Sequence, residues 1–195
     1  SRRHICCAGA AAASLMLMAT DLSDGASYIK DIDDILREWQ VRALFFDRVR
    51  WFDMVLPGIA MPQPYVSPWS RLIDLPYVAL GHVFSLWLSP DKALYGAFVV
   101  WPLMMAAVYS WFLARIGLSL FAGHSVSRPL MITCFMTMPI VGFVGTFEFT
   151  PTRIDHHNVQ IIAMLAMLYG LLRWDRRGGL LIGAGTAISI LIGLE

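Results

Sequence analysis

Long apolar runs recur along this chain and constrain its fold more than any other feature. They cover residues 5–20, 93–113, 129–145, 159–172 and 180–194. A helix needs about 20 apolar residues to cross a bilayer, and tilting lets a somewhat different length fit. Charged residues make up only 15% of the 195 residues, against about 25% in a typical soluble domain. The sequence therefore predicts an all-α, polytopic membrane protein with about five transmembrane helices.

Charge and cysteine usage exclude other classes. The net charge is +1 and no basic stripe is present, so no nucleic-acid partner is expected. Cys6, Cys7 and Cys134 lie within apolar runs, which is not the pattern of a disulfide framework. The chain begins without Met and ends at Glu195 inside an apolar run, so we expect it to be the N-terminal part of a longer protein.

The first apolar run, residues 5–20, has two interpretations. Arg2 and Arg3 precede it, as in a cleaved signal peptide. No convincing small-residue cleavage motif lies before Asp21, so a retained membrane anchor is favoured.

The polar section, residues 21–92, holds ten acidic and seven basic residues. Within residues 28–52, apolar positions recur at a helical period among charges, which predicts an amphipathic helix on the membrane surface. Five prolines and glycines between residues 57 and 68 predict an irregular loop. The run 72–88 is interrupted by Asp74, Pro76 and His82, so we expect it to dip into the membrane without crossing it.

The basic connectors indicate the orientation of the predicted spans. The connectors 115–128 and 173–179 are rich in arginine, which is typical of cytoplasmic loops. If the run 72–88 does not cross, residues 21–92 and 153–158 then lie on the same extracytoplasmic face. Acidic residues from the two segments can in that case build one site.

Polar residues between two apolar runs make residues 153–158 the first candidate site. Asp155 and His157 are two residues apart, and in an extended segment their side chains point the same way. One carboxylate and one imidazole together suit Mn²⁺, Mg²⁺ or Zn²⁺. In the alternative interpretation Asp155 only caps the following helix and His156 only faces water.

Further candidates lie in the polar section. Asp33 and Asp34 could supply a general base or a metal ligand, or be solvated charges on a surface helix. Trp69 could stack on a sugar or lipid and Arg71 could bind phosphate, or both could belong to an interfacial aromatic belt. Arg153 is a weaker candidate for phosphate binding.

Three segments together resemble a known family. Residues 33–37, 69–74 and 153–158 resemble bacterial members of the GT-C glycosyltransferase superfamily, which includes the catalytic subunit of oligosaccharyltransferases. By this resemblance Asp34 or Asp33 matches the acid of the first outer loop, and Asp155 with His157 matches a later Asp-x-His motif. These residues would hold Mn²⁺ or Mg²⁺. The family's further acidic loop and C-terminal domain have no counterpart in this chain.

The resemblance implies transfer of a sugar from a polyprenyl-phosphate-linked donor to an acceptor of unknown identity. The reaction would take place on the extracytoplasmic face of a bacterial inner membrane, with Arg71 or Arg153 near phosphate. Two other functions remain open at this point: a transporter or channel subunit, and a non-catalytic membrane scaffold. A transporter would place charges along a midplane path, whereas these predicted spans are nearly free of charge.

Overall fold

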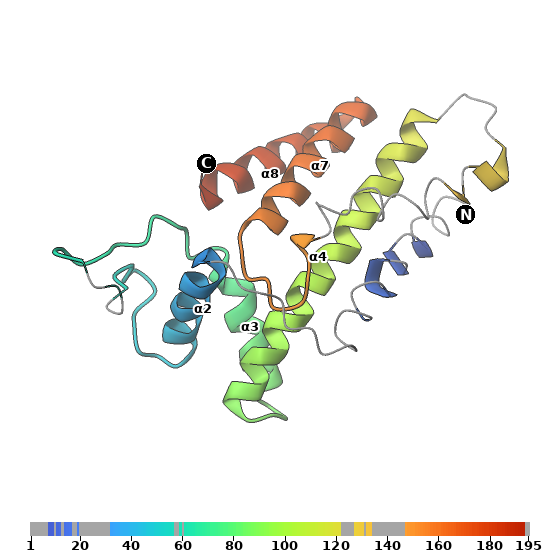
Figure 1. Ribbon diagram of the computed structural model, residues 1–195. Coiled ribbons are helices and arrows are strands. Elements are labelled where there is room, and N and C mark those ends of the chain that lie inside the picture. The colour runs from blue at the N-terminus through green and yellow to red at the C-terminus, as the bar shows by residue number, and fades with distance from the viewer. Residues whose placement is uncertain are drawn as a thin grey trace.

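The computed structural model describes residues 8–9, 11–12, 14–16, 19, 32–56, 59, 61–121, 127–130, 132–133 and 147–193 (Figure 1). These residues form helices and no β-strand, apart from an isolated bridge between Val55 and Val66. The predicted all-α class is therefore confirmed. The named helices are α2 (Ile32–Phe45), α3 (Asp74–Phe84), α4 (Pro90–Leu120), α7 (His157–Arg173) and α8 (Arg176–Ile192).

Helix α4 is the longest and contacts both α3 and α7. It begins after Ser89, which is extended, and Pro90 takes the first helical position, where a missing N–H costs nothing. Among the described residues, α4 is the one helix long and apolar enough to cross a membrane. The predicted span at residues 93–113 lies inside it.

The structure describes the other predicted spans to different extents. Helices α7 and α8 cover most of the runs 159–172 and 180–194, and each has 17 residues. The run 5–20 is described only in part. The run 129–145 lies almost wholly outside the described residues, as do Cys6, Cys7 and Cys134. Membrane crossing by these four runs therefore stays a prediction.

Helix α3 is shorter than the apolar run 72–88 that contains it. It has 11 residues, and after a turn at residues 85–89 helix α4 runs back along it (Figure 1). Gly81 of α3 lies against Phe45 of α2. A Cβ on Gly81 would lie 2.7 Å from the Phe45 ring, so a glycine at this position allows α2 and α3 to approach closely. At about 1.5 Å per residue, α3 spans roughly 17 Å, well short of a bilayer core.

Helix α2 buries its polar face against the protein. Asp34, Arg37 and Gln40 recur at three-residue spacing and are all buried, whereas Ile32 and Trp39 are exposed. Helix α2 therefore turns Ile32, Ile35 and Trp39 away from the protein, while Val41 and Phe45 in its C-terminal half pack into the core.

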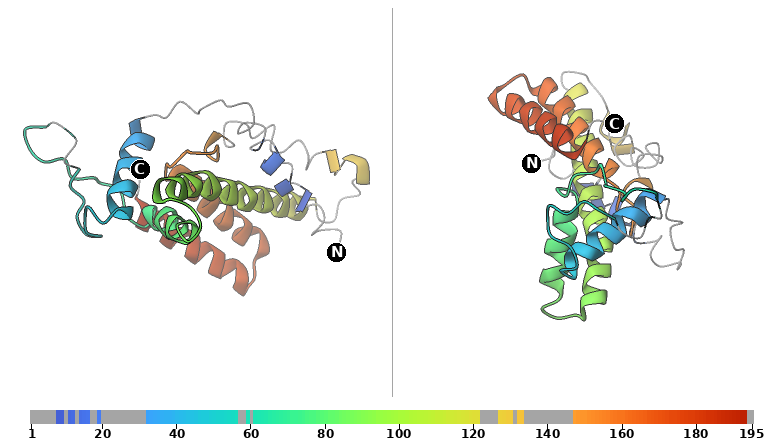
Figure 2. Two further views of the ribbon diagram at one scale, coloured as in Figure 1. Left: turned by 90° about the horizontal axis from the view of Figure 1, so that it is seen from below. Right: turned by 90° about the vertical axis from the view of Figure 1, so that its left-hand side faces the viewer.

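Helices α7 and α8 form a tight hairpin. A Cβ on Gly170 would lie 2.6 Å from the carbonyl oxygen of Gly178, and one on Gly185 would lie 2.7 Å from that of Ala163. Only small residues allow two helix backbones to approach so closely, as in membrane helix pairs. The hairpin lies beside the C-terminal half of α4, and α3 lies beside its N-terminal half (Figures 1 and 2).

The packing divides into two apolar clusters along α4. One joins α4 to α7 and includes Tyr109, Phe112, Phe149 and Tyr169. The other joins α2, α3, the N-terminal half of α4 and the segment before α7; its buried members are Val41, Phe45, Ile73, Tyr77, Leu94, Phe98, Ile154 and Ile192. The segment 149–154 contributes to both clusters, which fixes the position of the residues that follow it.

Pro102 inside α4 helps to anchor that same segment. A proline has no N–H, so the carbonyl of Phe98, four residues earlier, lacks its usual helical donor. The backbone N–H of Thr152 donates to this carbonyl at 3.0 Å. Thr152 has a φ of 70°, a left-handed conformation that threonine rarely adopts. The hydrogen bond from the proline site therefore holds a bent connection directly before Arg153.

Candidate functional site

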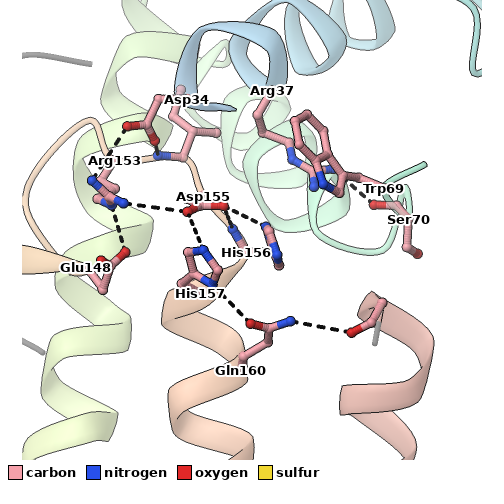
Figure 3. A network of polar contacts seen from close by, with 12 residues as sticks. Asp34, Arg37, Trp69, Ser70, Glu148, Arg153, Asp155, His156, His157 and Gln160 are labelled. Carbon is pink, nitrogen blue, oxygen red and sulfur yellow. Dashed lines mark hydrogen bonds and ion pairs between the residues drawn. The ribbon is translucent and has the colours of Figure 1, made fainter. Parts of the chain in front are cut away.

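Asp34 and the segment before α7 meet although they are 120 residues apart in the chain. Asp34 is fully buried, and its Oδ1 accepts the backbone N–H of Ile154 at 2.9 Å. Its Oδ2 lies 3.9 Å from Arg153 Nη1, and Arg153 Nη2 lies 3.6 Å from Asp155 Oδ2. Figure 3 shows Arg153 between the two carboxylates. Asp34 thus joins the candidate site through a guanidinium group and a backbone N–H.

The carboxylate of Asp155 contacts both histidines that follow it. Its Oδ1 lies 2.6 Å from His156 Nδ1 and accepts the His156 backbone N–H, while its Oδ2 lies 3.3 Å from His157 Nε2. Asp155 and His156 are each about 2% exposed, so the interpretation of His156 as a water-facing residue is wrong. The capping interpretation of Asp155 is also wrong, because the N-cap of α7 is His156 and has no side-chain capping bond.

The histidines and Arg153 set the protonation state of the site. Burial acts to raise the pKa of Asp155, but the hydrogen bond and charge of His156 and the charge of His157 hold that pKa below its ordinary value. Burial lowers the pKa of Arg153, and the negative charge of Asp155 opposes this shift. Asp155 is therefore held as a carboxylate, the form that binds a metal ion.

Asp155, His156 and His157 fit a small metal site. One ligand atom from each can be chosen so that all three lie within 4.8 Å of one another. Two ligands that bind one ion at about 2.1 Å lie about 3.0–3.4 Å apart at ordinary coordination angles. The 3.3 Å between Asp155 Oδ2 and His157 Nε2 falls in this interval. The side chain of His157 is 41% exposed, so an ion can reach it from solvent.

Gln160 orients His157 from the next turn of α7. Its Oε1 lies 3.1 Å from His157 Nδ1, and its Nε2 donates to the carbonyl of Gly193 at 3.4 Å. In the neutral form that metal binding requires, an Nδ1–H donated to Gln160 would leave the Nε2 lone pair of His157 available to an ion shared with Asp155 (Figure 3). Gln160 therefore links the candidate metal ligand to the end of α8.

Trp69 lies beside the histidines, and Arg37 packs against it. The ring centroids of Trp69 and His156 are 6.3 Å apart, and those of His156 and His157 are 4.4 Å apart. The guanidinium carbon of Arg37 lies 5.0 Å from the Trp69 ring centroid, a cation–π contact. Arg37 Nη1 also donates to the carbonyl of Ser70 at 3.2 Å, which fixes the Trp69 segment to α2 (Figure 3).

Arg71 lies in a separate buried cluster around Asp74. Its Nη1 lies 3.1 Å from Asp74 Oδ2 and donates to the carbonyl of Gln40 at 3.2 Å, and its Nη2 donates to the carbonyl of Asp53. Arg37 binds the other oxygen of Asp74 at 3.2 Å. Arg71 thus ties α2 to the loop that follows it and to the start of α3, and a phosphate-binding role for Arg71 stays a prediction.

A cleft of about 670 Å³ opens next to Trp69. Residues 67–72 form one side, Trp51, Phe52 and Met54 form another, and residues 190–193 at the end of α8 close it. Because Gln160 bonds to Gly193 and Trp69 contacts His156, this cleft adjoins the Asp155–His157 site. Asp33, the other predicted acid, lies one residue before Asp34 and is half-buried.

Four residues of this site had no role in the sequence-based prediction. Arg37 and Gln40 follow Asp34 at helical spacing, and that spacing could have indicated a shared polar face. Gln160 follows His157 by three residues, the spacing at which helix side chains meet. His156 gave no such signal, since its burial depends in part on packing against Trp69, far away in the sequence.

No protein-family model, curated protein or solved structure matches this chain. The resemblance to GT-C glycosyltransferases therefore rests on the three sequence segments alone.

Proposed function

We propose that this chain is part of a polytopic membrane glycosyltransferase of the GT-C type. It would move a sugar from a polyprenyl-phosphate-linked donor to an acceptor outside the cytoplasm of a bacterial cell. Mn²⁺ or Mg²⁺ would bind to Asp155 and His157. The observation that carries this proposal is the single buried network that joins Asp34 to residues 153–157, because two of the three segments that carry the family resemblance meet there.

The donor set supports a metal role for Asp155 and His157. Asp155 carries a carboxylate with a lowered pKa, and His157 has one nitrogen bonded to Gln160 and the other near Asp155. A divalent ion bound there would screen the negative charge of a phosphate leaving group. Arg153, with Asp34 and Glu148 on its other sides, would hold the carboxylate of Asp155 in place and add positive charge near that phosphate.

The remaining predicted acids would act on the acceptor. Of the two predicted acids, the half-buried Asp33 would position or deprotonate the acceptor hydroxyl or amide, and the fully buried Asp34 would act through Arg153 and the backbone of Ile154. The cleft beside Trp69 is large enough for a sugar, and the partly exposed Trp51 on its wall offers a flat apolar surface of the kind on which sugars stack. The exposed Ile32 and Trp39 of α2 suit a site at the surface of a bilayer, where a lipid-linked donor presents its headgroup.

The test is transferase activity of the full-length protein in liposomes that contain a polyprenyl-phosphate-linked sugar. We expect activity that requires Mn²⁺ or Mg²⁺, that chelation abolishes, and that falls by at least about 100-fold in Asp155→Asn and in His157→Ala. Asp91→Asn is the matched control, because that side chain is 82% exposed at the start of α4. We expect it to retain full activity.

Two results would contradict the proposal. Wild-type turnover in both site variants would remove the metal role of Asp155 and His157. Absence of any transfer, together with absence of Mn²⁺ binding by the full-length protein, would leave a non-catalytic membrane protein as the better description.

A further inference from the structure

Two arginines from different helices converge on one tyrosine at the far end of α7 from the candidate active site. Arg115 of α4 donates to the hydroxyl oxygen of Tyr169 through Nε at 3.0 Å and through Nη2 at 2.6 Å. Arg173, at the end of α7, donates to the same oxygen through Nη1 at 3.3 Å. A neutral phenol thus holds two cationic groups close together between α4 and α7.

Negative charge at this end does not balance the arginines. Asp175 pairs with Arg173 and also accepts the backbone N–H of Gly178 as the N-cap of α8. Among the described residues, Arg115 has no ion pair with a carboxylate, although it is only partly exposed. Arg176 and Arg177 add two further positive charges, so four arginines face one aspartate. A partly buried cation of this kind is stabilised by an anionic partner.

Aromatic and apolar side chains surround the basic end. The guanidinium carbon of Arg115 lies 5.7 Å from the ring centroid of Trp111. Trp174 forms the turn between α7 and α8 in a left-handed conformation, with φ of 49°, and is 88% exposed. Leu180 on the adjoining turn of α8 is 67% exposed. Tryptophan and arginine next to exposed leucine are typical of the level of a bilayer at which headgroups meet the acyl chains.

The length of α7 places this end about one bilayer away from the candidate active site. Seventeen residues at about 1.5 Å each span roughly 25 Å, close to the roughly 30 Å of a hydrocarbon core. His157 begins α7 and Arg173 ends it. If α7 crosses the membrane beside α4, the basic end lies at the opposite membrane surface from Asp155 and His157.

We propose that Arg115, Tyr169 and Arg173 form a binding site for the phosphate of an anionic phospholipid. The phosphate oxygens accept from the two guanidinium groups, Arg176 and Arg177 add long-range attraction, and the acyl chains lie along the exposed leucines of α7 and α8. Basic pockets between transmembrane helices on the cytoplasmic side bind anionic headgroups in this way. The proposal does not depend on the glycosyltransferase function, but it does depend on membrane insertion.

The test is lipid binding to the full-length protein by native mass spectrometry from a zwitterionic detergent. The probes are phosphatidylglycerol and phosphatidylcholine with identical acyl chains, which separate the anionic headgroup from the acyl chains. We expect the wild type to prefer phosphatidylglycerol and the double variant Arg115→Gln/Arg173→Gln to lose roughly tenfold in that preference. Arg50 is an exposed arginine at the other end of the molecule, so the control variant Arg50→Gln should keep the preference for phosphatidylglycerol. A wild type without preference, or a double variant that retains it, would overturn the proposal.

A second variant separates charge from folding. Arg115→Lys/Arg173→Lys keeps both positive charges and should retain most of the preference for phosphatidylglycerol. If this lysine pair loses as much preference as the glutamine pair, the loss reflects packing around Tyr169 and the proposal fails. Mn²⁺ binding to the same samples reports on the candidate metal site independently, so failure of the proposed function and failure of the lipid site give different results.

Discussion

The two ends of α7 are held in place by different kinds of contact. At its start, side chains and backbone groups far away in the sequence fix the polar residues: Asp34 from α2, Trp69 from the loop before α3, and Gly193 after α8. At its end, the polar contacts of Arg173 are with Tyr169 and Asp175, all within seven residues, and Arg115 adds a polar contact from α4. The polar contacts at the start of α7 therefore depend on the whole fold, whereas those at its end are largely local.

This difference has an energetic consequence. The contacts at the start are buried, so each polar group there carries the cost of desolvation unless its partner is present. The ion pair between Arg173 and Asp175 at the other end is substantially exposed, and solvent screens it. Substitutions at the start should therefore cost more than substitutions at the end, and the following predictions test this contrast in descending order of expected effect.

Removal of the Asp34 carboxylate should have the largest effect on stability. Asp34→Ala leaves the buried N–H of Ile154 without its acceptor and takes one carboxylate from Arg153, which should cost about 3–5 kcal/mol of unfolding free energy. Asp34→Asn keeps an oxygen acceptor and should cost less. Denaturant unfolding of the full-length protein in detergent measures both. Asp91→Ala, an exposed control, should change stability by less than about 0.5 kcal/mol; an equal loss in Asp91→Ala and Asp34→Ala would contradict this prediction.

The glycines of the α7–α8 hairpin provide the next test. A Cβ on Gly178 would collide with the carbonyl oxygen of Gly170, so Gly178→Ala should cost about 1–3 kcal/mol. The neighbouring Gly179 has open space around its Cβ direction, so Gly179→Ala should be neutral or should stabilise α8 by up to about 1 kcal/mol. Denaturant unfolding curves of Gly178→Ala and Gly179→Ala measure this difference in unfolding free energy. Equal effects of the two substitutions would show that the helices do not pack as described.

Part of this arrangement could be predicted from the sequence. The apolar runs gave the helices correctly where the structure describes them, because hydrophobic spacing and length are local properties. Asp155 and His157 were paired on the premise of an extended segment, but His156 between them lies in the right-handed helical region (φ −80°, ψ −17°), so the two side chains meet although that premise was wrong. The contact of Asp34 with Ile154 could not follow from spacing, because it depends on how α2 packs against the segment before α7. Only the resemblance connected the two segments.

The sequence also contained two signals that were not used. Pro102 interrupts an apolar run, and a proline inside a helix always frees a carbonyl four residues earlier, here that of Phe98. Nothing in the sequence specified that Thr152 would donate to it. The second is the three-residue spacing of Asp34, Arg37 and Gln40, which indicated a shared polar face of α2 but not that this face would be buried against the protein.

Gln160 should affect metal affinity more than stability. Gln160→Leu removes the acceptor that orients His157, so Mn²⁺ affinity should fall about 10- to 100-fold while the unfolding midpoint changes little. Gln160→Glu supplies a carboxylate in the same place and should keep or increase the affinity. Competition between Mn²⁺ and a fluorescent chelator measures both variants. Unchanged affinity in Gln160→Leu would show that Gln160 does not position a metal ligand.

The ion pair of Asp175 should give the smallest effect, and a pH-dependent one. The hydrogen bond from Arg173, together with the backbone N–H of Gly178, lowers the pKa of Asp175 to about 2 from an ordinary value of 3.8. Its contribution to stability is therefore present above pH 4 and is lost as the pH falls toward 2. Asp175→Asn can still cap α8 but cannot titrate, so the gap in thermal midpoint between wild type and variant should close between those pH values. A gap that stays constant across this range would contradict the assignment.

The most direct test of the central claim is the ligand environment of Mn²⁺ bound to the full-length protein, measured by pulsed electron paramagnetic resonance. Our account predicts one bound ion with a coupling to an imidazole nitrogen, which His157→Ala abolishes and Asp91→Asn leaves intact. An ion without nitrogen coupling, or coupling that survives in His157→Ala, would contradict the assignment of the site to Asp155 and His157.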